Sequence, residues 1–500
     1  MALQPIEIYD GGPEAFAPRA RWVFDTLLAP LGRAPLMVRE RTAAGDCALA
    51  WAREPVPGVP TLPCADEAMD VLLAGRPLPP GSFARIEGEA GQVVGAFPAG
   101  DAGHVAPFDL VASAFVLLAC WDERTCPQRD RFGRLPFQAS VFAQNPDLHI
   151  EDPAVDHYVD LLRTVVEPRL RALGLAPLPP PGWMWAAPAP DTGSAIPASF
   201  AVALTHDVDN VWRWTPRGFA ATAYRSARAV RHGRWDALGK ELGDLGEWLT
   251  VHVPRRTDPS WTFPQLLRGE DERRVSSTFF VIARHTHRRD GNQPVEYQRR
   301  IPVALEMLRH GRREVGLHGN DADRLGVDPL AADRTLLQER SGSPVEGVRY
   351  HYLRCLYHET LPLVERAGFT YDSSLAFAEH EGFRCGASFP FRPYCIAEER
   401  PLGLLELPLA VMDTTLVEPQ YRSLPAAEGE RATRKVLSTV ARTGGGVAVL
   451  WHNQRFDHRS TKGYDDVYWR LIDWAHDEGA FVGTAAGLVR RWNERIGAPA

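Results

Sequence analysis

The sequence predicts an α/β protein with a parallel sheet, either barrel-like or doubly wound, preceded by a smaller α/β domain. Two observations lead to this fold class. From residue 199 onward, apolar strand-like runs alternate with helical stretches, which is the pattern of repeated strand–helix units. Residues 176–198, in contrast, are crowded with proline and small residues, a composition that resists both helix and sheet.

Residues 1–175 are expected to form the N-terminal α/β accessory domain. Helical periodicity covers three stretches: residues 19–31, 108–120 and 152–173. Asp152 is expected to cap the third of these helices, and Pro168 to kink it or end it early. Short apolar pieces between residues 36 and 97 are candidate strands. No catalytic constellation is recognised here, so the site is expected in the second domain.

Residues 176–198 are predicted to be a Pro-rich linker and residues 199–500 the second domain. A Pro-rich linker acts as a semi-rigid spacer, and the same composition could also serve as a recognition segment. Strands are predicted at residues 200–204, 275–282, 314–318, 346–349, 369–371, 404–408, 447–451 and 481–482. Residues 257–263 are expected to form a turn. Helices are predicted at residues 213–249, 297–310, 330–340, 360–367, 428–442 and 464–478, with one more after residue 482.

Composition restricts the functional classes. The 500 residues exceed what one core usually serves, and 45% apolar with 24% charged residues is ordinary for a globular chain. A net charge of −7 argues against a general nucleic-acid binder. Seven scattered cysteines without a CxxC motif suit reduced thiols. The start lacks a signal-peptide pattern, and the longest apolar stretch is too short to span a bilayer, so a cytoplasmic location is predicted.

Two carboxylates, Asp207 and Asp209, follow the first predicted strand of the second domain, with His206 beside them. Side chains alternate along a strand, so both acids leave on the same side. Two acids placed there need a nearby cation or a shared proton. The alternative is a strand-end turn in which an aspartate caps the next element.

Further polar residues follow other predicted strands: His318, Arg349 with His351, Asp372, and His452 with Asn453. In parallel α/β folds the carboxyl ends of the strands meet at one edge, where the chemistry is done. Any one of these residues is more often a cap or a hydrogen-bonding group than a catalyst. Together they indicate a site.

Metal-assisted hydrolysis is the chemistry that these residues could support. Asp209 and His318 offer oxygen and nitrogen ligands that suit zinc, nickel, cobalt or manganese. A bound divalent cation makes hydroxide available near neutral pH. Asp207 could then act as general base, while His452 could protonate a leaving amine. Arg349 could pair with Asp207.

Several segments resemble, in order, the motifs of the polysaccharide deacetylase family, the NodB-homology group or carbohydrate esterase family 4. They are Thr205-His-Asp-Val-Asp209, Ser277-Thr-Phe-Phe280, Glu314-Val-Gly-Leu-His318, Gly347-Val-Arg-Tyr-His-Tyr-Leu-Arg354, Tyr371-Asp-Ser-Ser374 and Val449-Leu-Trp-His452. The resemblance covers about residues 199–490, and residues 109–123 resemble the accessory region that precedes such domains. It implies a distorted (β/α) barrel of the NodB-homology type, with one divalent metal, that removes acetyl groups from N-acetylated sugars.

The same resemblance implies residue roles. Asp207 resembles the base, Arg349 the residue that orients it, and His452 the acid. Asp209 and His318 resemble metal ligands, and Asp372 falls near the motif that tunes the acid. Neighbouring positions in these motifs are expected to contact the substrate: Tyr350, His351 and Trp451.

Two departures from the family pattern concern the metal. The usual Asp-Asp pair is spread to Asp-Val-Asp, and the position of a second histidine, four residues after His318, holds Ala322. Asp321 is the first candidate for the third ligand, since it would share a face with His318 if a helix begins there. Other candidates are Asn320, His351 and His206. Without a replacement the metal site is degenerate.

Three functions remain open. The first is a cytoplasmic, metal-dependent deacetylase that acts on an N-acetylated sugar or glycan precursor. The second keeps the fold but hydrolyses a non-sugar amide such as a ureide. The third is a catalytically inactive domain that binds a glycan or a protein partner. The metal content of the purified protein would distinguish the two enzyme hypotheses from the binding domain. The sequence identifies neither the substrate nor the oligomeric state.

Overall fold

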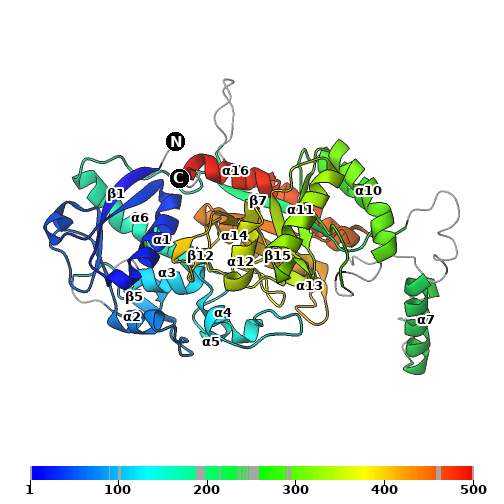
Figure 1. Cartoon of the computed structure of the whole chain (residues 1–500), viewed down its shortest axis with the longest axis horizontal. Helices are drawn as coiled ribbons and strands as arrows, with labels where there is room; N and C mark the ends of the chain where they lie inside the picture. Colours follow the sequence, from blue (N-terminus) through cyan, green and yellow to red (C-terminus); the bar gives the residue numbers. More distant parts are fainter. Residues whose placement is uncertain are drawn as a thin grey trace, which may run out of the picture.

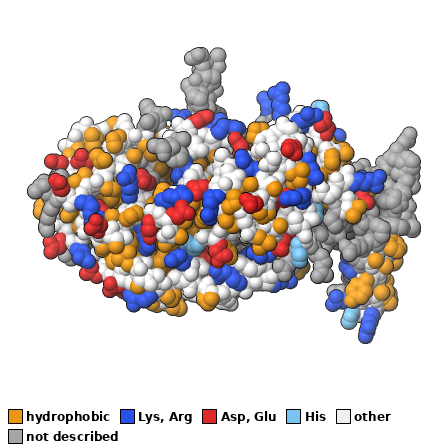
Figure 2. Space-filling view, in the orientation of Figure 1, with side chains coloured by type: hydrophobic (Ala, Val, Ile, Leu, Met, Phe, Trp, Pro, Cys, Tyr) orange, Lys and Arg blue, Asp and Glu red, His pale blue; other side chains and the backbone are white. Residues whose placement is uncertain are grey.

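The computed structural model describes residues 3–88, 91–99, 103–186, 198–212, 216–233, 258–287, 290, 294–457 and 463–497, with single residues between 235 and 246. The N-terminal region, coloured blue to cyan, lies beside a larger region coloured green to red (Figure 1). Within the described residues, every helix is too short or too polar to cross a membrane. On the face seen in Figure 2, acidic and basic side chains are interspersed.

A four-stranded parallel sheet, in the order β2-β1-β3-β4, forms the centre of the N-terminal region. An antiparallel hairpin, β5-β6, follows it. The strands are β1 (Gln4–Asp10), β2 (Arg33–Val38), β3 (Leu49–Ala52), β4 (Thr61–Pro63), β5 (Ala84–Gly88) and β6 (Gly91–Gly95). The helices are α1 (Ala17–Leu28), α2 (Asp66–Leu73), α3 (Leu110–Leu118), α4 (Trp121–Thr125), α5 (Val141–Gln144) and α6 (Ala154–Ala172). The predicted α/β class of this region is confirmed.

Helix α6 differs from its prediction in two respects, the effect of Pro168 and the residue at its N-cap. It continues through Pro168, because Val166 and Leu170 on either side of the proline are fully buried and hold the helix against the core. Pro153 occupies the cap position, whereas Asp152 pairs with the His157 imidazole at 2.8 Å. Tertiary packing thus overrides the local signals.

The larger region is built on a nine-stranded sheet in the order β14-β11-β10-β9-β8-β7-β16-β15, with β17 also paired to β7. All of these pairings are parallel. The strands are β7 (Phe200–Val208), β8 (Thr278–Val281), β9 (Glu314–Gly319), β10 (Gly347–Tyr350), β11 (Tyr371–Asp372), β14 (Leu405–Glu406), β15 (Leu409–Met412), β16 (Gly446–Leu450) and β17 (Ala480–Gly483). A small hairpin joins β12 (Tyr394–Cys395) to β13 (Arg400–Pro401).

The two ends of this sheet are consecutive along the chain. Strand β14 lies at one end and β15 at the other, and only residues 407 and 408 separate them. Leu407 N–H donates to the Asp372 carbonyl at 2.9 Å, while the Pro408 carbonyl accepts from Ala448 N–H at 2.8 Å. The segment 405–412 therefore closes the sheet into a distorted barrel, as the sequence predicts.

Helices follow the strands and lie outside the barrel (Figure 1). They are α7 (Pro216–Arg231), α9 (Phe263–Glu272), α10 (Pro294–His310), α11 (Val327–Ser341), α12 (Tyr357–Arg366), α13 (Asp413–Val417), α14 (Ala426–Thr443), α15 (Tyr464–Asp477) and α16 (Ala485–Ile496). The sequence did not predict α9, α13 or β15. The helix predicted over 213–249 is interrupted: α7 ends at Arg231, a turn follows at residues 232–233, and the described residues between 235 and 246 are helical again. Residues 247–257 lie outside the described residues.

Buried polar contacts join the N-terminal region to the barrel. Arg384 of the barrel pairs with Glu123, which also accepts a hydrogen bond from the Tyr357 N–H. Ser388 N–H donates to the buried Asp156 carboxylate at 2.9 Å. Residues 187–197 of the predicted linker lie outside the described residues, and the division of the chain at residues 176–198 stays a prediction.

Candidate active site

Strand β7 delivers both aspartates of the first motif to the carboxyl edge of the barrel. All nine of its residues are buried, because it lies in the middle of the sheet between β8 and β16. Asp207 is its last residue but one, and Asp209 follows the strand directly. The side chain of Asp207 is 4% exposed and that of Asp209 17%, so Asp209 is the more accessible of the two.

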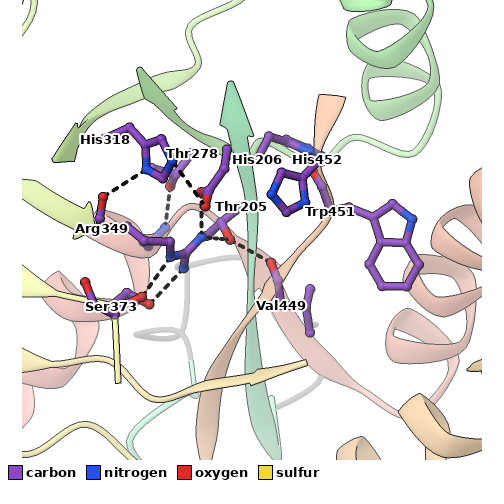
Figure 3. Close-up of polar contacts among 12 residues, drawn as sticks. Thr205, His206, Thr278, His318, Arg349, Ser373, Val449, Trp451 and His452 are labelled. Atoms are coloured by element: carbon purple, nitrogen blue, oxygen red, sulfur yellow. Dashed lines mark hydrogen bonds and ion pairs between the residues drawn. The ribbon is translucent and has the colours of Figure 1, made fainter. Parts of the chain in front are cut away.

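Arg349, on β10, is fully buried and orients Asp207. Figure 3 shows its guanidinium between Thr205 and Ser373. One guanidinium nitrogen donates to Thr205 Oγ1 at 2.7 Å and to Asp207 Oδ1 at 3.2 Å. The others donate to the carbonyl and the hydroxyl of Ser373 at 2.7 and 2.9 Å. The guanidinium also lies 4.5 Å from the centre of the Phe280 ring. These contacts satisfy a charge that would be costly to bury alone.

His318, at the end of β9, is held so that one ring nitrogen faces the aspartates. Its Nδ1 lies 2.9 Å from the Arg349 carbonyl, which can only accept, so Nδ1 carries a proton. Its Nε2 faces Asp209 Oδ1 at 3.1 Å and Asp207 Oδ2 at 3.8 Å. Burial lowers the pKa of His318, but the two carboxylates raise it more, so the net shift is upward.

His351 completes a cluster with Asp209 and His318, in which one ligand atom of each lies within 4.8 Å of the others. Burial lowers the pKa of His351 to about 4, although Asp209 opposes this shift. Burial raises the pKa of Asp209, but the imidazoles of His351, His318 and His452 lower it more, and it falls well below the usual range.

These three side chains fit a divalent cation. Two imidazole nitrogens and one carboxylate are a common ligand set for zinc and related metals, and they leave a position open. The hydrogen bond from His318 Nδ1 to the Arg349 carbonyl is the outer contact that orients a ligating histidine. The geometry thus places His351, predicted as a substrate contact and secondary ligand candidate, where a third ligand is needed.

Asp321, the first candidate for the third ligand, is placed elsewhere. Its carboxylate pairs with Arg354 and lies 3.7 Å from Arg324, outside the cluster. The reason is local: the chain turns after β9, and the next helical turn begins only at Asp323. Asp321 therefore does not share a helical face with His318.

Two other ligand candidates are engaged in the surrounding structure. The Asn320 amide donates to Asp333 at 2.6 Å, and its oxygen accepts from Ala322 N–H at 2.8 Å. His206 lies in the core, with Nδ1 2.6 Å from the Trp451 carbonyl and Nε2 3.1 Å from a Glu270 oxygen.

His452 follows β16 and approaches Asp209 from another direction. Its Nε2 lies 3.5 Å from Asp209 Oδ2, whereas His318 and His351 both approach Oδ1. Its Nδ1 donates to Asp413 Oδ1 at 2.6 Å. Burial lowers the pKa of His452, but the Asp413 carboxylate raises it more, to about 9. The pKa of Asp413 is in turn lowered, since His452 and Arg455 outweigh its burial.

Asp413 and Arg455 are site residues that the sequence argument missed. Arg455 Nε donates to Asp413 Oδ2 at 2.8 Å, so both carboxylate oxygens are occupied. Asp413 directly follows β15, as His452 follows β16, and Met412 pairs with Leu450 in the sheet. The signal used for the other residues, a polar side chain after a strand, would have found Asp413 if β15 had been recognised.

Asp372, predicted near the motif that tunes the acid, lies on β11 and not beside His452. It is fully buried, accepts hydrogen bonds from Ser374, and is the sheet partner of Glu406. Burial raises its pKa to about 6, and burial and the neighbouring Asp372 raise that of Glu406 well above its ordinary value. The carboxylate that contacts His452 is that of Asp413.

Two predicted substrate contacts are buried. Trp451 is 0% and Tyr350 1% exposed. The Trp451 indole donates to the Tyr464 carbonyl at 3.0 Å and points away from His318 and Arg349 (Figure 3). Tyr350 packs in the core at the end of β10. In this structure neither offers a surface to a substrate.

Comparison with known proteins gives three findings. Residues 62–170 match a family described as a family of unknown function (DUF7033). No curated protein matches the sequence. Solved structures match in part, as follows.

A structure described as that of a polysaccharide deacetylase from Mycobacterium smegmatis is 16% identical, with a TM-score of 0.40, and covers 63% of this chain and 98% of that chain. A Puue allantoinase structure is 12% identical, with a TM-score of 0.39 and coverages of 59% and 91%. A structure described as a polysaccharide deacetylase from Pseudomonas aeruginosa PAO1 is 14% identical, with a TM-score of 0.38 and coverages of 59% and 92%.

Proposed function

We propose that this protein is a metal-dependent amide hydrolase of the deacetylase type, which removes an acetyl group from an N-acetylated sugar or glycan precursor. The observation that carries the proposal is the arrangement around Asp209. Two imidazoles, His318 and His351, face one of its oxygens, and the acid candidate His452 faces the other. The base candidate, Asp207, lies beside them and is oriented by Arg349.

Each residue has a defined task in this reaction. A divalent cation, when bound by Asp209, His318 and His351, would polarise the acyl carbonyl and lower the pKa of a water molecule. Asp207 accepts the proton of the attacking water. His452 donates its Nε2 proton to the leaving nitrogen, while Asp413 holds the Nδ1 proton. The C–N bond breaks, the oxygen of water ends in acetate, and the amine leaves with the donated proton.

A biosynthetic precursor is the favoured substrate. All seven cysteines are free thiols, which is usual for cytoplasmic proteins, and we place the reaction in the cytoplasm. A finished wall polymer is a poor substrate there. An intermediate of surface polysaccharide or glycolipid synthesis fits better.

The experiment is an acetate-release screen of the full-length protein over N-acetylated sugars, sugar nucleotides and chitooligosaccharides, with zinc, nickel, cobalt and manganese in turn. Metal-dependent acetate release that is lost in Asp207→Asn supports the proposal. A parallel arm with a ureide detects the alternative amide hydrolase. Failure of the protein to bind any of the four metals would support a glycan- or partner-binding domain instead.

A further inference from the structure

A loop of the N-terminal region reaches the candidate active site. Residues 130–134 lie between α4 and α5, within the stretch that matches the family of unknown function. Arg134 donates to the Tyr352 carbonyl at 2.7 Å, and Arg354 donates to the Phe132 carbonyl at 3.0 Å. Arg134 is itself fixed, since its guanidinium donates to Asp130 Oδ2 at 2.7 and 2.9 Å. The loop and the segment after β10 are thus tied together in both directions.

The segment held by this loop has a strained backbone. Tyr352 and Leu353 have φ values of 59° and 56°, so two consecutive non-glycine residues adopt the left-handed conformation. Such strain persists only where the surroundings enforce it, and it gathers at functional sites. His351, the third member of the metal-ligand cluster, directly precedes these two residues.

Three rings connect the N-terminal loop to the cluster. The His351 imidazole stacks on the Tyr352 ring, with centroids 3.9 Å apart and planes 20° apart. The other neighbour of Tyr352 is Phe132, with centroids 4.7 Å apart and planes 18° apart. The guanidiniums of Arg131 and Arg134 lie 4.7 and 4.9 Å from the Phe132 centroid. Stacked aromatic rings and cation–π contacts resist rotation of each member.

We propose that Phe132 of the N-terminal region is a positioning residue for His351, which it holds through Tyr352 so that Nε2 faces Asp209. The inference rests on the proposed function, because it takes His351 as a metal ligand. It gives the N-terminal region a role: the barrel alone carries the ligands, and the loop at residues 130–134 sets the orientation of one of them. Residues that orient a ligand typically contribute 10- to 100-fold to metal affinity.

The test measures cobalt and zinc affinity of the full-length protein by calorimetric titration. Phe132→Ala is expected to weaken binding about 10- to 100-fold, whereas Phe132→Tyr, which keeps the ring, stays near the parent. Arg129→Ala is the matched control, since this arginine directly precedes the loop and, among the described residues, its hydrogen bonds go to the carbonyls of residues 123, 126 and 128. In a His351→Ala background, Phe132→Ala should cost nothing further.

A second measurement does not need the metal. Hydrogen–deuterium exchange of the amides of residues 350–355 in the metal-free protein should be faster in Phe132→Ala than in the parent and in Arg129→Ala. The inference would be overturned by unchanged exchange in Phe132→Ala or by parental metal affinity of this variant. It would also be overturned if Phe132→Ala lowered metal affinity in the His351→Ala background as much as it does in the parent. If the parent protein bound no metal, the proposed function itself would be contradicted. Faster exchange in Phe132→Ala would in that case still support the part of the inference that Phe132 holds residues 351–353 in place.

Discussion

The carboxylate of Asp413 accepts a hydrogen bond of 2.6 Å from Nδ1 of His452, and Arg455 donates to the other oxygen at 2.8 Å. This relationship fixes which nitrogen of His452 faces the cluster. With the proton held on Nδ1, Nε2 is the atom that points toward Asp209, 3.5 Å away. In the proposed reaction Asp413 acts through His452, in the manner of the buried aspartate that orients a catalytic imidazole.

The first prediction concerns this contact. Asp413→Asn removes the charge that favours the imidazolium and allows the other tautomer, so acetate release should fall about 10²- to 10⁴-fold. Metal content should stay at the parental level, because Asp413 lies outside the ligand cluster. Glu418→Gln is the matched control, since Glu418 pairs with Arg455 at 2.6 Å but does not contact His452. Equal losses in both variants would argue against an orienting role.

Asp413 also marks the limit of what could be predicted from the sequence, because it follows a strand that the sequence pattern did not reveal. The strands that carry Asp207, His318, Arg349 and His452 were predicted, because each is an apolar run bounded by polar residues. Strand β15 has only four residues and directly follows Pro408, where the predicted strand 404–408 ends, so residues 409–412 were not assigned to a strand. The aspartate at its end was therefore not considered, and the role was assigned to Asp372.

The second prediction separates the two candidates for the third ligand. His351→Ala should weaken zinc affinity by at least about tenfold, since it removes one of three protein ligands. Asp321→Ala should bind zinc as the parent does, because its carboxylate pairs with Arg354 and not with the cluster. Calorimetric titration of both variants gives the comparison. The reverse order of effects would restore Asp321 as the ligand.

The failure to choose His351 from sequence has a physical reason. A third ligand at Asp321 required a helix to start directly after β9, and the chain forms a turn instead. His351 lies in the short helical turn that follows β10, and the next residue, Tyr352, adopts the left-handed conformation. Tyr352 contacts residues 132 and 134 of the N-terminal region, which lie more than 200 positions away in sequence, and a local sequence pattern does not reveal such contacts.

The third prediction concerns the base and the acid. Asp207→Asn and His452→Gln should each lower acetate release about 10²- to 10⁴-fold, since each removes one proton-transfer group. The double variant should be little worse than the poorer single variant, because both act in one mechanism. Arg349→Lys should be milder than Arg349→Ala, as lysine keeps the charge but loses the planar fork. A fully active Asp207→Asn protein with normal metal content would remove Asp207 from the mechanism.

The fourth prediction concerns pH and the buried pair of Asp372 and Glu406. Both pKa values are raised in the folded protein, that of Asp372 to about 6. The folded protein therefore keeps protons that the unfolded chain releases, so the free energy of unfolding falls as pH rises from about 4 to about 6. For Asp372 alone the fall is about 3 kcal/mol.

Glu406→Gln should flatten this pH dependence, because it removes the ionisation of Glu406, whose pKa is raised by burial and by the neighbouring Asp372. Denaturant unfolding of the parent and the variant at several pH values between 4 and 8 measures it. Parallel curves for the two proteins would show that the pair carries no such linkage. Glu365→Gln, which alters an ion pair with Arg400 that is partly exposed, serves as control.

The most direct test of the account is the position of a bound metal. Crystals of the protein grown with zinc, with data collected at the zinc edge, would show the ion in an anomalous difference map. The account predicts one strong peak about 2.0–2.2 Å from Asp209, His318 Nε2 and His351 Nε2, with a fourth position open toward Asp207 and His452. A zinc peak beside Asp321 would contradict this prediction. So would a protein that contains one equivalent of zinc but shows no peak at Asp209.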